Sequence, residues 1–236
     1  MTTVVIVTGA ASGLGLKTVE VLLDQGYKVS AWDLNPVSIF SPSLIQFTVD
    51  VTDTNSISKA LESTISIFSK VDVLINLAGI VSFSPLFTES SVHSLAEWEK
   101  IMKINLIGTF DVSRQVSKYI NNGLIILVAS ICAFGSTGSL VAYAATKMAN
   151  VSLAMPMSRD LAFKNTRVIS ISPGLIETPL SANVPAEGKA RFIKESAVGR
   201  LGKTEDFAHA VLFAINNKYL NGCNLDLNGG SIYPNL

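Results

Sequence analysis

Tyr143 and Lys147 stand four residues apart in the stretch VAYAATKMAN, residues 141–150. Residues with this spacing share one face of a helix, so both side chains can point into the same cleft. A free tyrosine has a pKa of about 10, and a neighbouring ammonium favours the phenolate and lowers that pKa. The pair can therefore serve in proton transfer near neutral pH. The same spacing is also common on solvated helix faces, so the pair alone leaves an ordinary surface helix open.

Ser130 favours the chemical interpretation of this pair. It lies thirteen residues before Tyr143, directly after the apolar run LIILVA that predicts a strand. Ligand-binding residues of open α/β sheets gather where the strands end. We therefore expect Ser130, Tyr143 and Lys147 to meet in one site.

A glycine-rich stretch, TGAASGLG at residues 8–15, follows the first predicted strand and opens the first predicted helix. Gly9 permits a tight turn, Gly13 lets backbone N–H groups approach a pyrophosphate, and Gly15 allows close packing of the helix. The spacing departs from G-x-G-x-x-G, because three residues separate the first two glycines. A nucleotide site is predicted, with a purely structural turn as the alternative.

Two aspartates that end predicted strands complete this nucleotide site. Asp33 ends KVSAWD, eighteen residues after Gly15, where a carboxylate binds an adenosine ribose and repels the extra phosphate of NADP. NAD is therefore the predicted cofactor. A simple turn that starts at Asp33, before Asn35 and Pro36, remains the alternative. Asp50 ends the next strand and is expected near the adenine.

The elements that must position these residues are strands and helices in alternation. Continuous apolar strands that alternate with helices predict a parallel sheet covered on both faces, a doubly wound Rossmann-type α/β fold. We expect one domain over residues 1–236, with its least regular part, a mobile substrate loop or lid, around 175–200. A solvent-exposed surface loop is the alternative for that part. The expected long helices are 94–119, 143–162 and 204–216.

Composition excludes several classes of function. The 236 residues are 48% hydrophobic, and eighteen basic residues balance eighteen acidic ones, so no basic field attracts nucleic acid. The longest apolar run has six residues, far below the roughly 20 that span a bilayer. The N-terminal MTTVVIVTGA lacks the features of a secretory signal and is expected to be a strand. Two cysteines favour a reducing compartment, the cytoplasm or alternatively the mitochondrial matrix. No metal site is predicted.

Six motifs together resemble the short-chain dehydrogenase/reductase family in order and spacing. They are TGAASGLG, NLAG at 76–79, Asn105 in KINLIGTF, Ser130, YAATK, and SPGLIETPL at 172–180.

The resemblance implies a role for each catalytic residue. Tyr143 would exchange the proton of the carbonyl/alcohol pair, and Ser130 would hydrogen-bond the same oxygen. Lys147 would hold the nicotinamide ribose and lower the tyrosine pKa, and Asn105 would support a water that links Lys147 to solvent. The implied cofactor contacts are Gly9, Ser12, Gly13, Leu14, Gly15, Asp33, Asp50, Val51, Ala78, Gly79, Tyr143, Lys147, Pro173, Gly174, Ile176 and Thr178.

Five longer stretches are VASICAFGSTGSLVAYAATK, MPMSRDLA, SPGLIETPLSANVP, GRLGKTEDFAHAV and YLNGCNLDLNGG. Within the family, they resemble the type 2 3-hydroxyacyl-CoA dehydrogenases. That branch implies an NAD-dependent homotetramer in fatty acid metabolism that acts on 3-hydroxyacyl-CoA or 3-oxoacyl-CoA. Alternatives are a 3-oxoacyl-carrier-protein reductase, another small-alcohol or steroid dehydrogenase, and a non-catalytic nucleotide-binding regulator. Two departures stand out: Leu77 replaces the second asparagine of the commoner NNAG, and Thr137 stands where the branch often has a cleft-lining glutamine.

The predicted lid offers side chains for a substrate. Apolar residues suit an acyl chain, and three cations suit an anionic carrier, although these cations also fit an exposed helix face. The residues are Leu180, Val184, Phe192 and Ile193, and Lys189, Arg191 and Lys194.

Overall fold

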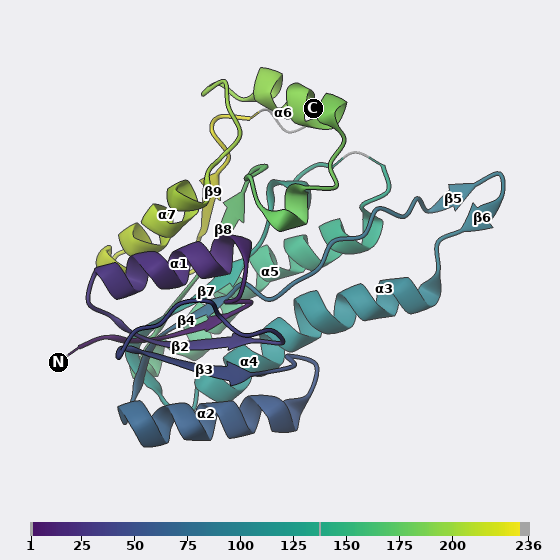
Figure 1. Cartoon of the computed structure of the whole chain (residues 1–236). Coiled ribbons are helices and arrows are strands. Elements are labelled where there is room, and N and C mark those ends of the chain that lie inside the picture. The colour runs from purple at the N-terminus through teal and green to yellow at the C-terminus, as the bar shows by residue number, and fades with distance from the viewer. Residues whose placement is uncertain (1, 137, 232–236) are drawn as a thin grey trace.

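The central feature of the protein is a seven-stranded parallel sheet (Figure 1). The structure, a computed structural model, describes residues 2–136 and 138–231. The strand order is β3-β2-β1-β4-β7-β8-β9, and it reverses direction between β1 and β4. The expected Rossmann-type fold in a single domain is therefore confirmed. The strands are β1 (Val4–Thr8), β2 (Lys28–Asp33), β3 (Leu44–Thr48), β4 (Val71–Asn76), β7 (Ile120–Val128), β8 (Arg167–Pro173) and β9 (Asn224–Leu227).

Helices cover both faces of this sheet, because its strands are apolar on both sides. Val5 and Val7 face a core cluster built with α1 and α7, whereas Ile6 faces a second cluster built with α2, α4 and α5. Consecutive residues of one strand thus enter opposite cores, as strand geometry requires. The helices are α1 (Gly13–Asp24), α2 (Thr54–Phe68), α3 (Leu95–Met102), η1 (Lys103–Gly108), α4 (Thr109–Val116), α5 (Val141–Asp160), α6 (Ala186–Glu195) and α7 (Thr204–Asn216).

The helix expected over 94–119 is continuous but not uniform. Its middle, η1, is π-helical and joins α3 to α4. A π-helical turn widens the helix and turns its side chains and carbonyls away from the usual pattern. Asn105 lies in this wide turn.

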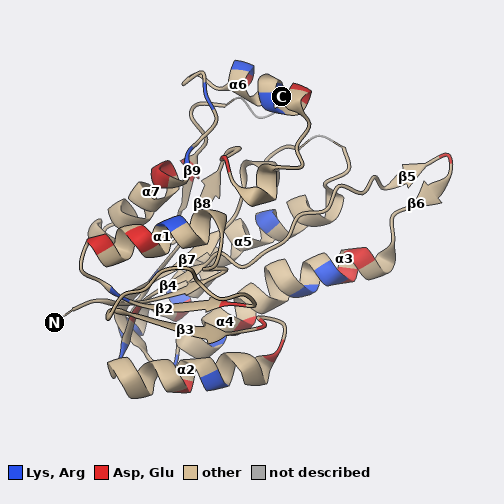
Figure 2. Cartoon of the chain, viewed as in Figure 1, with Lys and Arg blue, Asp and Glu red and all other residues tan. Residues whose placement is uncertain are grey.

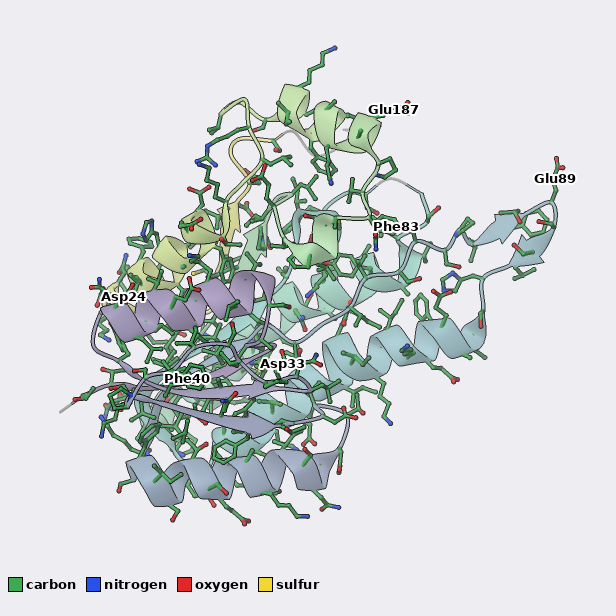
Figure 3. The ribbon with its side chains drawn as sticks, viewed as in Figure 1. Asp24, Asp33, Phe40, Phe83, Glu89 and Glu187 are labelled. Carbon is green, nitrogen blue, oxygen red and sulfur yellow. The ribbon has the colours of Figure 1, made fainter. Side chains whose placement is uncertain are left out.

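Two segments differ from expectation. Residues 173–200 are not merely irregular, since they contain the ten-residue helix α6 and the short helix η4 (Pro179–Ser181). A hairpin of β5 (Phe87–Thr88) and β6 (Ser91–Val92) was not expected and projects from the body, with Glu89 at its tip (Figures 1 and 3).

The surface carries no strong charge pattern on the described residues. Lys and Arg residues are interspersed with Asp and Glu residues along the ribbon (Figure 2). No helix of the described ranges is long and apolar enough to cross a membrane. Within those ranges no group of three or more His, Cys, Asp or Glu side chains is arranged for a metal ion. Both cysteines, Cys132 and Cys223, are unpaired thiols.

Candidate active site

A cavity of about 870 Å³ opens where the strands of the sheet end. It lies at the point where the strand order reverses, which is the usual ligand site of such sheets. Every residue that the sequence assigned to catalysis or cofactor binding lines it, with the exception of Asn105. Those that line it are Gly9, Ser12, Gly13, Leu14, Gly15, Asp33, Asp50, Val51, Ala78, Gly79, Ser130, Tyr143, Lys147, Pro173, Gly174, Ile176 and Thr178.

The glycine-rich turn is a close-fitting cradle on one side of this cavity. Gly9 has a φ of +66°, and a Cβ there would lie 2.8 Å from the Ala78 nitrogen. At Gly15 a Cβ would lie 1.9 Å from the Gly9 carbonyl oxygen, so any side chain would force the turn and α1 apart. Helix α1 starts at Gly13 without a side-chain cap or an acidic residue in its first turn. Its first N–H groups and positive dipole end therefore favour an anion such as a pyrophosphate.

Asp33 lies at the end of β2, and its carboxylate faces the glycine-rich turn. One oxygen accepts a hydrogen bond from the Ala11 amide at 3.0 Å, and the other accepts from the Asn35 amide at 2.9 Å. The hydrogen bond from the Asn35 amide forms the simple turn at Asp33 that the sequence offered as the alternative to a ribose contact. Asp33 starts this turn and also lines the cavity, and its contact with an adenosine ribose stays a prediction.

Asp50 lies two residues after β3, which ends at Thr48 and not at Asp50 as expected, and Thr52 holds its carboxylate. The Thr52 amide and hydroxyl both donate to Asp50 Oδ1 at 2.8 Å, and these bonds hold the pKa of Asp50 below its usual value. The carboxylate is therefore charged and fixed beside the cavity.

Leu77 packs partly buried against the core, where the family commonly has asparagine. The turn after β4 is fixed by Thr8, whose hydroxyl oxygen accepts from the amides of Leu77 and Ala78 at 3.1 Å each. A hydroxyl on β1 therefore holds this turn. Thr8, the first residue of TGAASGLG, was not among the residues expected at the site.

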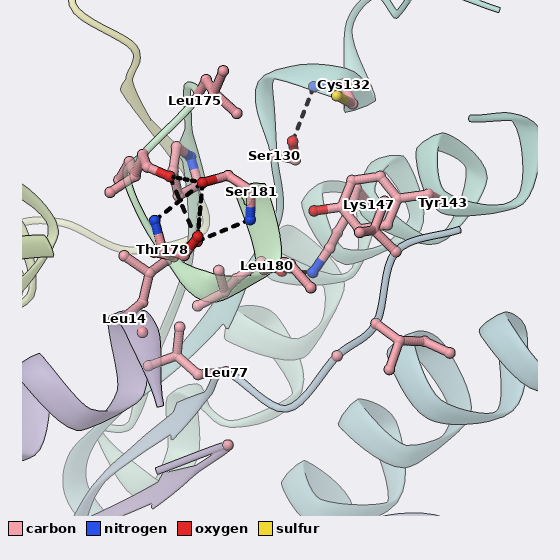
Figure 4. A pocket seen from close by; sticks show the side chains of 18 of the residues that line it. Leu14, Leu77, Ser130, Cys132, Tyr143, Lys147, Leu175, Thr178, Leu180 and Ser181 are labelled. Carbon is pink, nitrogen blue, oxygen red and sulfur yellow. Dashed lines mark hydrogen bonds between the residues drawn. The ribbon is translucent and has the colours of Figure 1, made fainter. Parts of the chain in front are cut away.

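Ser130 projects from the end of β7 toward Tyr143 (Figure 4). Its hydroxyl oxygen accepts a hydrogen bond from the Cys132 amide at 3.1 Å and so caps a short helix. A hydroxyl can donate one hydrogen bond while it accepts another, so Ser130 can also donate into the cavity. Cys132 also lines the cavity, and burial raises the pKa of its thiol. The sequence analysis missed this thiol as a site residue.

Tyr143 and Lys147 lie on the cavity side of α5, as the spacing predicts (Figure 4). The Lys147 ammonium lies 5.5 Å from the centre of the Tyr143 ring and donates to the Val128 carbonyl at 2.9 Å. Val128 is the last residue of β7. The lysine is thus tethered to the same strand end that carries Ser130.

Burial controls the proton affinity of both groups. Tyr143 is half-buried, and desolvation by the surrounding protein raises its pKa well above the usual value, while hydrogen bonding with Ser130 lowers it. Burial lowers the pKa of Lys147 to about 8. The expected lowering of the tyrosine pKa by Lys147 is therefore not seen in this structure. Ser130 is the group that opposes desolvation at Tyr143.

Asn105 lies behind the cavity wall and is fully buried. Its side-chain oxygen accepts from the Ile80 amide at 2.9 Å, and its side-chain nitrogen donates to the Ile80 carbonyl at 2.8 Å. Gly79 separates it from the cavity, since a Cβ there would lie 3.2 Å from Asn105 Oδ1 and 3.8 Å from Lys147 Nζ. The side chain fixes the chain beside Lys147, and its link to a water stays a prediction.

Helix α6 and the segment before it cover the cavity with mainly apolar side chains. Leu180, Val184 and Phe192 line the cavity, as does Arg191. The guanidinium of Arg191 donates to Glu195 at 2.7 Å, so a carboxylate offsets this cation. Ile193, Lys189 and Lys194 lie outside the lining. Thr137, which stands where the related branch often has a cleft-lining glutamine, lies outside the described residues.

Comparisons with known proteins agree with this geometry. The family model described as short chain dehydrogenase matches residues 3–189. The 3-hydroxyacyl-CoA dehydrogenase type-2 of Bos taurus is 35% identical, covering 96% of this chain and 94% of that protein. The 3-oxoacyl-(acyl-carrier-protein) reductase FabG of Thermotoga maritima is 28% identical, with 97% of each chain covered. The ligand-free aldohexose dehydrogenase of Thermoplasma acidophilum has a TM-score of 0.87 at 26% identity, covering 97% of this chain and 93% of that one.

The match spans the parts that build the cavity. The family model covers the glycine-rich turn, the strand that ends at Ser130, and α5 with Tyr143 and Lys147. The relatives extend the similarity over nearly the whole chain. This chain belongs to the short-chain dehydrogenase family of oxidoreductases.

Proposed function

We propose that the protein is an NAD(H)-dependent oxidoreductase that interconverts 3-hydroxyacyl-CoA and 3-oxoacyl-CoA. The observation that carries the chemistry is the meeting of Ser130, Tyr143 and Lys147 in one cavity beside the start of α1. A secondary alcohol and its ketone differ by a hydride and a proton. A bound nicotinamide cofactor supplies or takes the hydride, and the proton must come from the protein.

Each polar group of the cavity has a defined part in the proton step. During reduction, the Tyr143 hydroxyl donates its proton to the carbonyl oxygen, which becomes the alcohol. Ser130 donates a hydrogen bond to that same oxygen with its hydroxyl proton, while its oxygen accepts from the Cys132 amide. Lys147, held by the Val128 carbonyl, supplies positive charge beside the tyrosinate that remains. Oxidation reverses each step.

A preference for NAD(H) over NADP(H) is the first prediction. The Asp33 carboxylate lines the cavity and would face the extra phosphate, and no lysine or arginine lies between residues 29 and 58. We expect kcat/KM to be much higher with NADH than with NADPH, and Asp33→Asn to narrow this ratio. Asp24→Asn, at the far end of α1 (Figure 3), is the matched control and should leave the ratio unchanged. Equal wild-type values for the two cofactors would contradict the role of Asp33.

The acyl-thioester substrate is supported by the apolar cover of the cavity and by the relatives. Leu180, Val184 and Phe192 offer a surface for an acyl chain and would exclude water from the reacting atoms. The Bos taurus relative is named for 3-hydroxyacyl-CoA. The Thermotoga maritima relative, named for a carrier-protein thioester, supports the reductase alternative with the same chemistry.

The second prediction concerns the carrier. Acetoacetyl-CoA should be reduced far better than free acetoacetate, and Arg191→Ala should raise KM for the thioester more than it lowers kcat. Because Glu195 offsets the Arg191 charge, the expected rise in KM is about three- to tenfold and falls with added salt. Lys194→Ala, outside the cavity lining, should change neither constant. If steroids or small free alcohols are far better substrates than any thioester, the acyl-CoA assignment fails, and the proton-transfer roles remain.

A homotetramer is the proposed assembly, supported by exposed apolar side chains on the helices next to the site. Ile107 is 58% exposed and Phe110 is 46% exposed, while Met155 on α5 is 50% exposed. Such side chains on adjacent helices favour association through a symmetric interface. Light scattering should therefore give a mass of four chains, and a monomer at micromolar concentration would contradict this third prediction.

A reducing compartment is proposed for the protein, the cytoplasm or the mitochondrial matrix. The free thiols of Cys132 and Cys223 support it. Localisation of a tagged chain in cells checks this proposal, and accumulation outside these compartments would contradict it.

A further inference from the structure

Asn150 lies on α5, one turn after Lys147, and is only 1% exposed. Its side-chain nitrogen donates to two backbone carbonyls, those of Asn105 and Val128, each at 3.3 Å. It lies outside the cavity lining. Both of its hydrogen-bond partners nevertheless belong to segments that contact Lys147 or carry Asn105.

The orientation of the Asn150 amide follows from its partners. A carbonyl oxygen only accepts hydrogen bonds, so the amide nitrogen must face the two carbonyls and Oδ1 must face away. This Oδ1 atom is buried and has no hydrogen-bond partner among residues 2–136 and 138–231. An unpaired buried acceptor is unfavourable and calls for a donor such as an ammonium or a water.

The two carbonyls that Asn150 holds are both part of the Lys147 environment. The Val128 oxygen also accepts from the Lys147 ammonium at 2.9 Å, so both donors converge on one atom. The Asn105 carbonyl belongs to the π-helical turn and also accepts from the Thr109 hydroxyl at 2.9 Å. Asn150 therefore ties α5 to the end of β7 and to the wide turn at the same place.

We infer that Asn150 is a positioning residue for the dehydrogenase reaction, which holds Lys147 in place through the shared Val128 carbonyl. This inference rests on the proposed role of Lys147. It adds a fifth polar group to Ser130, Tyr143, Lys147 and Asn105.

The surroundings of Lys147 make the inference measurable. Among the described residues, the titratable groups that interact with Lys147 are Tyr143 on its own helix and Cys132 from the short helix after β7. Asn150 is neutral. Replacing its amide by a carboxylate adds one charge close to the ammonium, and replacing it by leucine removes both the donor and the acceptor at similar volume.

The test measures the titration of Lys147 by NMR of protein labelled with ε-¹³C-lysine, where Lys147→Met identifies the signal. We expect Asn150→Asp to raise the Lys147 pKa by about one unit, since a nearby carboxylate favours the ammonium. Asn150→Leu is expected to lower it, because the surroundings become less polar. Lys147 titrations of both variants that superimpose on the wild type would overturn the inference. If the aspartate variant does not fold, the leucine variant alone decides.

Turnover provides the second readout. Asn150→Leu should lower kcat about three- to tenfold, the loss expected for one hydrogen bond, and should shift the pH profile in the direction of the Lys147 titration. Ser158→Ala is the matched control, because it removes a buried hydroxyl of the same helix whose hydrogen bond within the described ranges goes to the Met155 carbonyl. It should change neither kcat nor the profile. An unshifted Asn150→Leu profile would mean a purely structural role. Full activity of Lys147→Met would instead refute the proposed function. The NMR titration would still show whether Asn150 affects the pKa of Lys147.

Discussion

Tyr143→Phe is expected to lower kcat by about a hundred- to ten-thousand-fold, the range by which general acid–base groups accelerate reactions. The substitution keeps the ring in its place on α5 and removes only the hydroxyl that exchanges the proton. Binding of NADH, followed by its fluorescence, should remain close to that of the wild type. The fourth prediction thus separates loss of chemistry from loss of the site.

The control for this variant is Tyr219→Phe, because the Tyr219 side chain is 97% exposed and lies outside the cavity lining. It should retain full turnover. A Tyr143→Phe protein that keeps more than about a tenth of the activity would contradict the assignment of Tyr143 as the proton donor.

The fold could be predicted because its signals are local. Apolar strands alternate with helices at regular intervals, and Gly9 and Gly15 stand where only a glycine fits the turn. The catalytic residues also follow strand ends or share a helix face. These relations depend on short stretches of sequence, so Ser130, Tyr143 and Lys147 could be expected together before any coordinates.

What escaped prediction depends on contacts between distant parts of the chain. From the sequence, the Arg191 cation fits either an anionic carrier or an exposed helix face, and its pairing with Glu195 depends on the exact bounds of α6. Thr8 holds the turn after β4 only because β1 and β4 are neighbours in the sheet.

The proton affinity of Tyr143 shows the same limit at the site itself. Spacing on a helix predicts that Lys147 is near, and it is. Spacing cannot say how deeply the pair is buried. In this structure desolvation raises the tyrosine pKa and lowers the lysine pKa, so burial outweighs the mutual effect that sequence suggests.

Lys147→Met is expected to abolish turnover and also to stabilise the folded protein at pH 7. Burial lowers the Lys147 pKa from 10.5 to about 8, so the ammonium destabilises the folded state at neutral pH. By linkage this costs at most about 3 kcal/mol of unfolding free energy. Methionine fills a similar volume without the charge. We therefore expect a gain of about 1–3 kcal/mol at pH 7, measured by denaturant unfolding.

The pH dependence of this gain distinguishes a buried charge from better packing. Between pH 8 and 10.5 the unfolded lysine binds more protons than the folded one, so wild-type stability rises with pH through this window. The advantage of Lys147→Met should be complete below pH 8 and shrink toward pH 10.5, whereas a packing gain would stay constant. Lys118→Met, at an exposed lysine remote from the cavity, should show no such trend. A variant less stable than the wild type at pH 7 would mean that the bond from Lys147 to Val128 outweighs the desolvation of the ammonium. We expect a protein that is more stable but inactive. This result would mean that the Lys147 charge destabilises the fold and is kept because proton transfer requires it.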